Sequence, residues 1–215
     1  SGEGESVSRQ GIVAIDLSTY ELTDFEPEEA PYYVSSLALS PDNSVLYISD
    51  TYELIGVSTE TGIENGFEVY TDNEMFALAV SSDGTVYAGG FFTEVNDDSS
   101  YAYLVALNPE NGSAIETFAP QLDSVVFALA FSPNEEVLYA SDGNGTIFAL
   151  NPVNGDKLLT SPVVADGDII SLAVSPDGKT LYAGGDFYEF TSYLIDVGEG
   201  FIADAETGAV IGTPY

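Results

Sequence analysis

The stretch Leu37 to Asp50, LALSPDNSVLYISD, recurs three more times in this chain of 215 residues. The other copies are LAVSSDGTVYAGG from Leu78, LAFSPNEEVLYASD from Leu129 and LAVSPDGKTLYAGG from Leu172. Each copy is an alternating apolar run, a Ser-Pro-Asp-Gly type turn and a second apolar run that contains a tyrosine. Proline presets φ, and Asp, Asn and Gly favour a tight reversal, so each copy predicts a β-hairpin.

The spacing of these hairpins predicts an all-β fold built from repeated blades. The copies begin 41, 51 and 43 residues apart, which matches the period of one β-propeller blade. A second hairpin follows each of them, and its copies are IGVSTETG (55–62), VALNPENG (105–112), FALNPVNG (148–155) and FIADAETG (201–208). Two hairpins per repeat predict a four-bladed β-propeller with four-stranded antiparallel blades. The small LAxS strand should be innermost, because the centre of a propeller is narrow.

Short and long blades alternate along the chain. The first and third copies end in Ser-Asp, at residues 49–50 and 141–142, whereas the second and fourth end in Gly-Gly, at 89–90 and 184–185. The long copies continue into aromatic-rich insertions. Leu37 and Leu129 are 92 residues apart, and Leu78 and Leu172 are 94 apart, so the sequence indicates a duplicated two-blade unit.

One hairpin of the second kind is surplus. A fifth copy, GIVAIDLSTYELTDFEP (11–27), opens the chain, and its TDFEP resembles ETFAP (116–120) at the end of the second blade. This hairpin and the one at 201–208 are both predicted for the outer half of the fourth blade, where only one fits. The predicted organisation is a polar tail at 1–10 and a single domain at 11–215, with the hairpin 11–27 followed by blades at about 33–70, 76–120, 125–160 and 169–215.

A hairpin left without a place predicts self-assembly. It would present unpaired backbone groups and apolar side chains, which favour pairing with another chain. The predicted contacts are Val13, Ile15, Leu17, Phe201 and Ala203. Completion of a neighbour's blade would be a head-to-tail contact that produces a filament. The alternatives, a hairpin packed on its own chain or a disordered N-terminus, remain open at this point.

The charge balance excludes several classes of partner. The chain has 36 acidic residues and only three cations, Arg9, Lys157 and Lys179, for a formal charge of -33. Such a chain cannot neutralise a phosphate backbone or an anionic membrane surface, so we expect no nucleic acid partner. No apolar run has the length of a membrane span, so we expect no membrane insertion. The charge indicates solubility through self-repulsion, or a halophilic protein adapted to high salt.

The repeats resemble those of a known group. LAVSPDGKTLYAGG followed by a VALNPENG-type hairpin is similar to the YVTN/surface-layer class of β-propeller repeats, and YAGGFFTEV…LVALNPENG is also similar to the delta-60 repeat. The resemblance covers nearly all of residues 11 to 212. It implies an extracellular or cell-surface protein, since the group includes surface proteins and adhesins. The group also has a lactonase branch, but such propeller enzymes rely on residues, often His or Trp, that this chain lacks.

The sequence predicts no catalytic residues and no cofactor. Nucleophilic catalysis needs a base beside the nucleophile, and the chain has no histidine and no cysteine. Paired carboxylates leave a hydrolase or lyase as a remote alternative. The function predicted first is a non-enzymatic structural protein, and the second is a binding module or adhesin for carbohydrate or a surface protein.

Two polar turns are candidate sites for a cation or a glycan. Asp142 and Asn144 have the spacing that opens a calcium loop, but Val153 stands where such a loop needs glutamate, so structural calcium is a weak prediction. Asn111 and Asn144 each begin an Asn-x-Ser/Thr acceptor sequence for N-glycosylation. Both asparagines fall in predicted turns.

Overall fold

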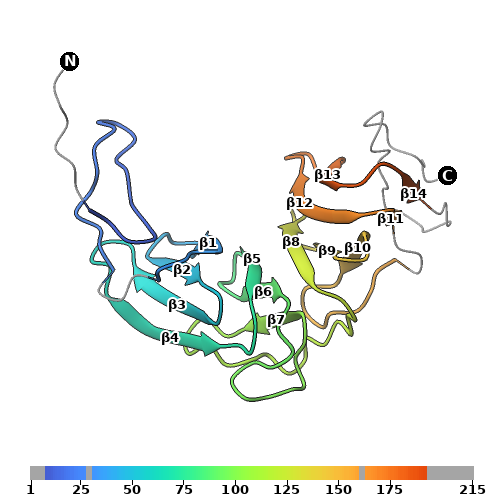
Figure 1. Ribbon diagram of the computed structural model, residues 1–215, viewed down its shortest axis with the longest axis horizontal. Coiled ribbons are helices and arrows are strands. Elements are labelled where there is room, and N and C mark those ends of the chain that lie inside the picture. Colours follow the sequence, from blue (N-terminus) through green and yellow to red (C-terminus); the bar gives the residue numbers. More distant parts are fainter. Residues whose placement is uncertain (1–7, 28–30, 160–162, 193–215) are drawn as a thin grey trace.

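The computed structural model describes residues 8–27, 31–159 and 163–192. Every regular element in these ranges is a β-strand, and neighbouring strands pair antiparallel. The described residues contain no helix long and apolar enough to cross a membrane. The sheets lie side by side along an open arc (Figure 1). The predicted all-β class is confirmed.

The strands form four sheets that follow one another along the chain. The first sheet contains β1 (Ser36–Leu39), β2 (Val45–Ser49), β3 (Glu53–Ser58) and β4 (Glu64–Tyr70). The second contains β5 (Met75–Val80), β6 (Val86–Gly90) and β7 (Leu104–Leu107). The third contains β8 (Val126–Phe131), β9 (Leu138–Asp142), β10 (Thr146–Leu150), β11 (Val163–Ala165) and β14 (Phe190–Ser192). The fourth contains β12 (Asp168–Val174) and β13 (Leu181–Asp186).

The four LAxS strands lie where the repeat predicts them. They are β1, β5, β8 and β12, and each contacts the next along the arc. Each also stands at one edge of its sheet. We therefore call the four sheets the first to fourth blades.

Strand number differs from the predicted four in the second and third blades. The second blade has three strands, and its outer hairpin is reduced to an isolated bridge between Leu107 and Ala114. The third blade gains β14, which pairs with β11. The fourth blade has two strands within the described residues. Side-chain packing between blades, rather than strand count, keeps the repeat regular.

The Ser-Pro-Asp turn is held by a small hydrogen-bond cage. Ser40 Oγ donates to Asp42 Oδ1 at 2.7 Å and accepts from the Val45 N–H at 2.9 Å. Asp42 also accepts from the Ser44 N–H at 3.0 Å. These donors, the Ser40 hydroxyl foremost, lower the pKa of Asp42 to about 2. The same Ser-to-Asp or Ser-to-Asn bond returns in the other three blades, as Ser81–Asp83, Ser132–Asn134 and Ser175–Asp177, and such local bonding favours a turn over a continued strand.

The predicted two-blade period is visible in the loops of the long blades. Asp72 accepts N–H bonds from Thr93 at 2.7 Å and Glu94 at 2.9 Å. Asp166 accepts from the N–H groups of residues 188 and 189 in the same way, at 2.8 and 2.9 Å. One acidic residue before each long blade therefore fixes the insertion that follows its Gly-Gly pair.

Candidate assembly interface

The N-terminal segment is a copy of the outer hairpin of a blade. Ile15 and Leu22 form an isolated bridge, and Leu107 and Ala114 form the same bridge 92 residues later in the second blade. The turn between the bridged residues is also the same. The Tyr20 N–H donates to the Asp16 carbonyl at 2.7 Å, as the N–H of residue 112 donates to the carbonyl of residue 108 at 2.9 Å.

Tyr20 stands at a turn position that glycine occupies elsewhere. Its φ is +61°, and the matching glycines, Gly62, Gly112 and Gly155, have φ values of +72°, +69° and +76°. A side chain with a Cβ is disfavoured in this left-handed region. The hairpin therefore keeps the backbone of the repeat although one of its residues is poorly suited to it.

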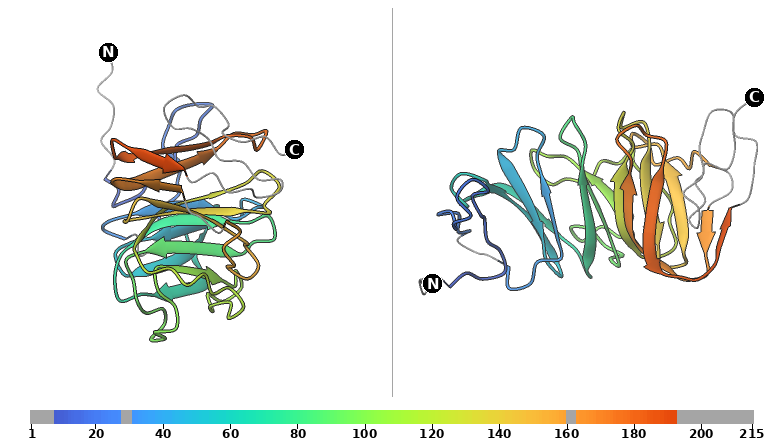
Figure 2. Two further views of the ribbon diagram at one scale, coloured as in Figure 1. Left: turned by 90° about the vertical axis from the view of Figure 1, so that its right-hand side faces the viewer. Right: turned by 90° about the horizontal axis from the view of Figure 1, so that it is seen from above.

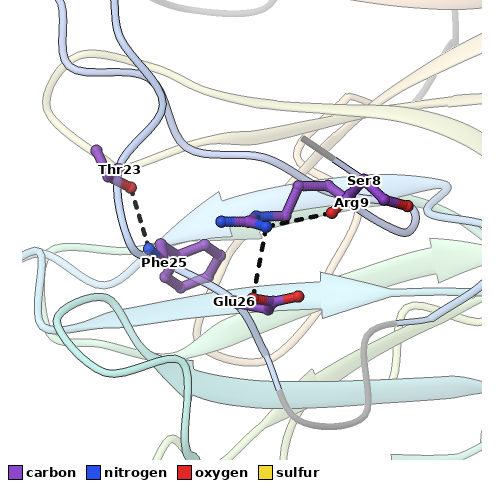
Figure 3. Close-up of polar contacts among 5 residues, drawn as sticks. All are labelled: Ser8, Arg9, Thr23, Phe25 and Glu26. Carbon is purple, nitrogen blue, oxygen red and sulfur yellow. Dashed lines mark hydrogen bonds and ion pairs between the residues drawn. The ribbon is translucent and has the colours of Figure 1, made fainter. Parts of the chain in front are cut away.

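This hairpin packs on the first blade. Ile12 and Phe25 are buried in one cluster with Ile48, Ile55 and Val57 of β2 and β3. Arg9 at the start of the hairpin lies 3.5 Å from the Glu26 carboxylate at its end and donates to the Ser8 carbonyl (Figure 3). In the same view, the Phe25 N–H donates to Thr23 Oγ1.

The packing repeats that of a preceding blade. Gly62 of the first blade lies so close to the end of the hairpin that an added Cβ would be 2.7 Å from the Glu26 carbonyl oxygen. Gly155 of the third blade is approached in the same way, because an added Cβ would be 2.7 Å from the Pro120 nitrogen. The TDFEP segment thus meets the first blade as ETFAP meets the third. The hairpin occupies the outer half of a blade that would precede the first blade.

None of the described strands forms the inner half of such a preceding blade. Val13 and Ile15 are 48% and 51% exposed, whereas their counterparts Val105 and Leu107 are 1% and 0% exposed. In the second blade these counterparts pack against the first blade. In the hairpin, their side chains face solvent.

The fourth blade ends the arc in the opposite way. Tyr182 of β13 is 59% exposed, whereas Tyr47 and Tyr87 at the same repeat position are 2% and 4% exposed. A Cβ added at Gly89 would lie 2.6 Å from Val126 Cγ1 of the next blade, whereas one added at Gly184 would meet no described atom within 4 Å. The fourth blade therefore has a face shaped for a following blade.

The first blade has the complementary face. Leu37 and Leu39 of β1 are each 48% exposed. Their counterparts in the third blade, Leu129 and Phe131, pack against the cluster that contains Tyr87. The N-terminal hairpin and β12–β13 lie toward opposite ends of the arc (Figure 2), so the two faces are not in contact there.

The residues predicted for assembly are only some of the apolar residues exposed at the ends of the arc. The structure places Val13, Ile15 and Leu17 on the surface, the last at 80% exposure, while Phe201 and Ala203 lie outside the described residues. Sequence reasoning missed Leu37, Leu39, Tyr182 and Gly184. Their position in the repeat was available as a signal, because Leu37 and Leu39 belong to the first of the four copies and Tyr182 and Gly184 belong to the fourth.

No family model and no curated protein matches the chain. Among solved structures, the chain is similar to the Myceliophteria thermophila Cps50 (Swd1) β-propeller domain, with a TM-score of 0.61 and 14% identity over 80% of this chain and 54% of that one. It is also similar to Kuenenia stuttgartiensis hydrazine synthase, with a TM-score of 0.59 and 21% identity over 83% of this chain and 48% of that one. The fold is a β-propeller. The chain spans about half the length of these two chains, and the YVTN repeat type stays a prediction.

A crevice opens between the second and third blades of the propeller. Its volume is about 330 Å³, and its walls include Tyr87, Phe131, Asp83 and Glu135. Burial raises the pKa of Tyr87 to about 12, and the Tyr87 hydroxyl donates to the carbonyl of residue 152 at 2.8 Å. The Glu135 carboxylate accepts the N–H and hydroxyl of residue 82 at 2.8 and 2.7 Å. Aromatic and acidic side chains therefore meet in this crevice, and Tyr87 and Glu135 each already have a hydrogen-bond partner in the protein.

Asp142 closes a turn of the propeller's third blade. It is 1% exposed, and it accepts N–H bonds from Thr146 at 2.8 Å and Asn144 at 3.0 Å. Burial raises the pKa of Asp142, although these two hydrogen bonds act to lower it. Asp142 is the one buried carboxylate among the described residues, which contain no group of three acidic, histidine or cysteine side chains placed to hold a metal.

The two glycosylation candidates are both on the propeller surface. Asn144 and Asn111 are exposed. Asn111 Oδ1 accepts the N–H of Ser113 at 3.0 Å, which shapes its turn. A glycan on either side chain would project into solvent.

Proposed function

We propose that this protein is a non-enzymatic structural subunit that assembles head to tail at the cell surface or outside the cell. The observation that supports it is the set of apolar side chains exposed at both ends of the described arc. One end carries the N-terminal hairpin with Val13 and Ile15 exposed, and the other carries β12 and β13 with Tyr182 exposed. The counterparts of these side chains inside the arc, such as Val105, Leu107 and Tyr87, are buried.

The chemistry of the ends suits such an assembly. With 36 acidic residues and three cations, a chain of this composition cannot hold a copy of itself through many ion pairs. Apolar side chains need no cation, and they are exposed on the segment at 12–15 and on β13. A contact between two different faces repeats indefinitely unless its rotation closes a ring, so the product is a filament or a surface layer.

Electron microscopy of the full chain in molar salt tests this proposal. We expect ordered threads, and light scattering should show mass rising with protein concentration. The double variant Val13→Glu/Ile15→Glu should keep its fold, because both side chains are half exposed, but should lose assembly. The matched control Phe91→Glu/Val153→Glu adds the same charge at exposed sites of the second and third blades and should assemble as the parent does. A strictly monomeric parent at high concentration would contradict the proposal.

The proposal of a cell-surface location includes N-linked glycans at Asn111 and Asn144. The resemblance to surface-layer repeats supports it, and the exposure of Asn111 and Asn144 is compatible with it. Intact-mass measurement of protein from its native source, before and after Asn111→Gln and Asn144→Gln, tests both sites. Unchanged mass in both variants beyond the substitutions would remove glycans from the proposal.

The crevice beside Tyr87 favours a second candidate, a carbohydrate-binding module. Aromatic walls with a few polar groups are typical of small-ligand sites. Titration calorimetry with neutral oligosaccharides should then show binding that Phe131→Ala and Glu135→Gln weaken. If no sugar of a broad panel gives a heat of binding, the carbohydrate-binding candidate is contradicted and the structural role is the one that remains.

A further inference from the structure

We infer that the crevice between the second and third blades takes an amino sugar, and that the carboxylates of Asp83 and Glu135 bind the ammonium group of this sugar. The inference rests on the carbohydrate-binding role, the second candidate proposed above, and names the class of sugar. It concerns two neighbouring blades within one molecule, so it is independent of the head-to-tail assembly.

Two departures from the repeat meet at this crevice. The second copy has Ser82 at the turn position where the other three copies have proline. The third copy has Glu135 at the position where the others have glycine or asparagine. The Glu135 carboxylate accepts the Ser82 N–H at 2.8 Å and the Ser82 hydroxyl at 2.7 Å. Proline has no N–H to donate, so this contact between blades depends on both departures.

Glu135 has a backbone conformation that is unfavourable for its residue type. Its φ is +55°, and the glycines at the same position, Gly84 and Gly178, have φ values of +93° and +70°. The Cβ of a non-glycine residue is crowded in this left-handed region, and such residues cluster at ligand sites. Both bonds from Ser82 go to Glu135 Oε2, which leaves Oε1 for a ligand.

The charges of Asp83 and Glu135 act on the same part of the crevice. Burial, followed by the negative charges of these two carboxylates, raises the pKa of Tyr87 to about 12. Hydrogen bonds from Ser81 and Thr85 lower the pKa of Asp83, which therefore stays ionised at neutral pH. A cleft with apolar walls and charges of one sign focuses the electric field and attracts ions of the opposite sign. The crevice is therefore suited to a cation.

The cations of the protein itself do not neutralise this pair of carboxylates. The chain has three, Arg9, Lys157 and Lys179. Arg9 is paired with Glu26, and this is the one ion pair among the described residues. The Lys157 ammonium lies over the Phe148 ring, 4.6 Å from its centroid. The charge of the crevice is thus complementary to an ammonium group brought by a ligand.

Aromatic rings supply a surface for the body of the sugar. Tyr87 lies edge to face with Phe118 and Phe131, and each pair of ring centroids is 5.3 Å apart. All three side chains line the crevice. Phe131 is a further departure from the repeat, since the second copy has Val80 at this position. The volume of about 330 Å³ is at the lower end of the range for small-ligand sites, so the crevice suits a sugar unit rather than a long chain.

Two matched trisaccharides test the role of the ammonium group. The glucosamine trimer and cellotriose have the same β-linked backbone, and they differ in carrying an ammonium or a hydroxyl group at carbon 2 of each unit. Titration calorimetry of the full chain in low salt, at about pH 5.5 where exposed carboxyl groups are ionised, compares their affinities. We expect the glucosamine trimer to bind about tenfold more tightly, because hydrogen bonds between two charged groups are the stronger ones. Molar salt should reduce this preference.

Substitutions that remove charge separate the crevice from the net charge of the chain. The double variant Asp83→Asn/Glu135→Gln keeps an oxygen acceptor at both positions, and Asn134 already stands at the position of Asp83 in the third copy. This variant should lose the preference for the glucosamine trimer. The matched control Asp42→Asn/Asp177→Asn removes two charges at the same turn position of the first and fourth blades and should keep the preference. Circular dichroism of both variants confirms their fold.

Each outcome supports or overturns the inference. A preference that the crevice variant loses and the control keeps supports it. Equal affinity of the parent for the two sugars, or tighter binding of cellotriose, would overturn the ammonium site and leave the carbohydrate-binding candidate standing. Absence of binding of either sugar would overturn both. A preference that persists in the crevice variant, or that falls equally in the two variants, would belong to the charge of the whole chain and would overturn the inference.

Discussion

The Ser141 hydroxyl donates a buried hydrogen bond of 2.8 Å to the Ile169 carbonyl and thereby joins the third blade to the fourth. Ser141 is fully buried, and the residue at the same position of the long blades is glycine. The bond is therefore a feature of one short-to-long junction and not of every blade.

Replacement of Ser141 by alanine should lower the free energy of unfolding by about 1–2 kcal/mol, because a buried carbonyl loses its partner. Urea denaturation of the parent and the variant measures this loss. The control Ser113→Ala removes an exposed hydroxyl and should change stability little. Equal effects of the two substitutions would contradict a special role for the Ser141 bond.

Replacement of Tyr20 by glycine should stabilise the N-terminal hairpin. Tyr20 has a φ of +61° where three other copies of the turn have glycine, and a left-handed non-glycine residue costs about 1 kcal/mol or more. The gain should appear as a higher melting temperature of the full chain. Tyr32→Gly is the control, since Tyr32 is exposed and lacks a positive φ. A loss of stability in Tyr20→Gly as large as in the control would contradict the strain.

The turns and the blade order were predictable because they depend on local chemistry. Ser40 and Asp42 close their own turn through bonds between residues two apart, so a short motif carries all the information. The innermost strands and the two-blade period follow from the same repetition, and the structure has them at the predicted places.

The exposure of Tyr182 was not predictable from its motif. Tyr47, Tyr87 and Tyr182 share one repeat position and were all predicted to be packed in the core or between blades, yet Tyr182 is exposed because no described residue of a following blade covers it. Burial here is a property of the neighbouring blade. The open arc could not be predicted from a local motif either. Its shape is the sum of small rotations between blades, and these rotations depend on contacts such as Gly89 with Val126.

Stability should fall modestly with acid below about pH 4, because the carboxyl groups concerned are exposed. The Ser40 hydroxyl and the Ser44 N–H lower the folded-state pKa of Asp42 from 3.8 to about 2, and hydrogen bonds from Ser81 and Ser175 lower the pKa of Asp83 and Asp177. A lowered pKa contributes stability above the unfolded value, and this contribution is lost as pH falls from 3.8 toward 2. Buried Asp142, whose pKa burial raises, has the opposite sign and opposes part of this loss.

Melting temperatures from pH 7 to pH 2 measure the effect. The variant Asp42→Asn keeps an oxygen acceptor in the turn but cannot be protonated, so its loss of stability below pH 4 should be smaller than that of the parent. An equal loss of melting temperature below pH 4 in the two proteins would show that protonation of Asp42 in its turn does not cause the effect.

Added salt should stabilise the folded chain and promote its assembly together. A formal charge of -33 makes each molecule repel itself and its copies, and the screening length falls from about 10 Å at 0.1 M salt to about 3 Å at 1 M. The melting temperature and the assembled mass in light scattering should both rise between low and molar salt and then level off. The control Glu110→Gln/Glu136→Gln removes two exposed charges and should slightly reduce both salt dependences. A melting temperature that is flat or falls over this range would mean that like-charge repulsion does not govern this fold, and an assembled mass that falls with salt would mean that ion pairs, rather than exposed apolar side chains such as Leu39 and Tyr182, hold the copies together.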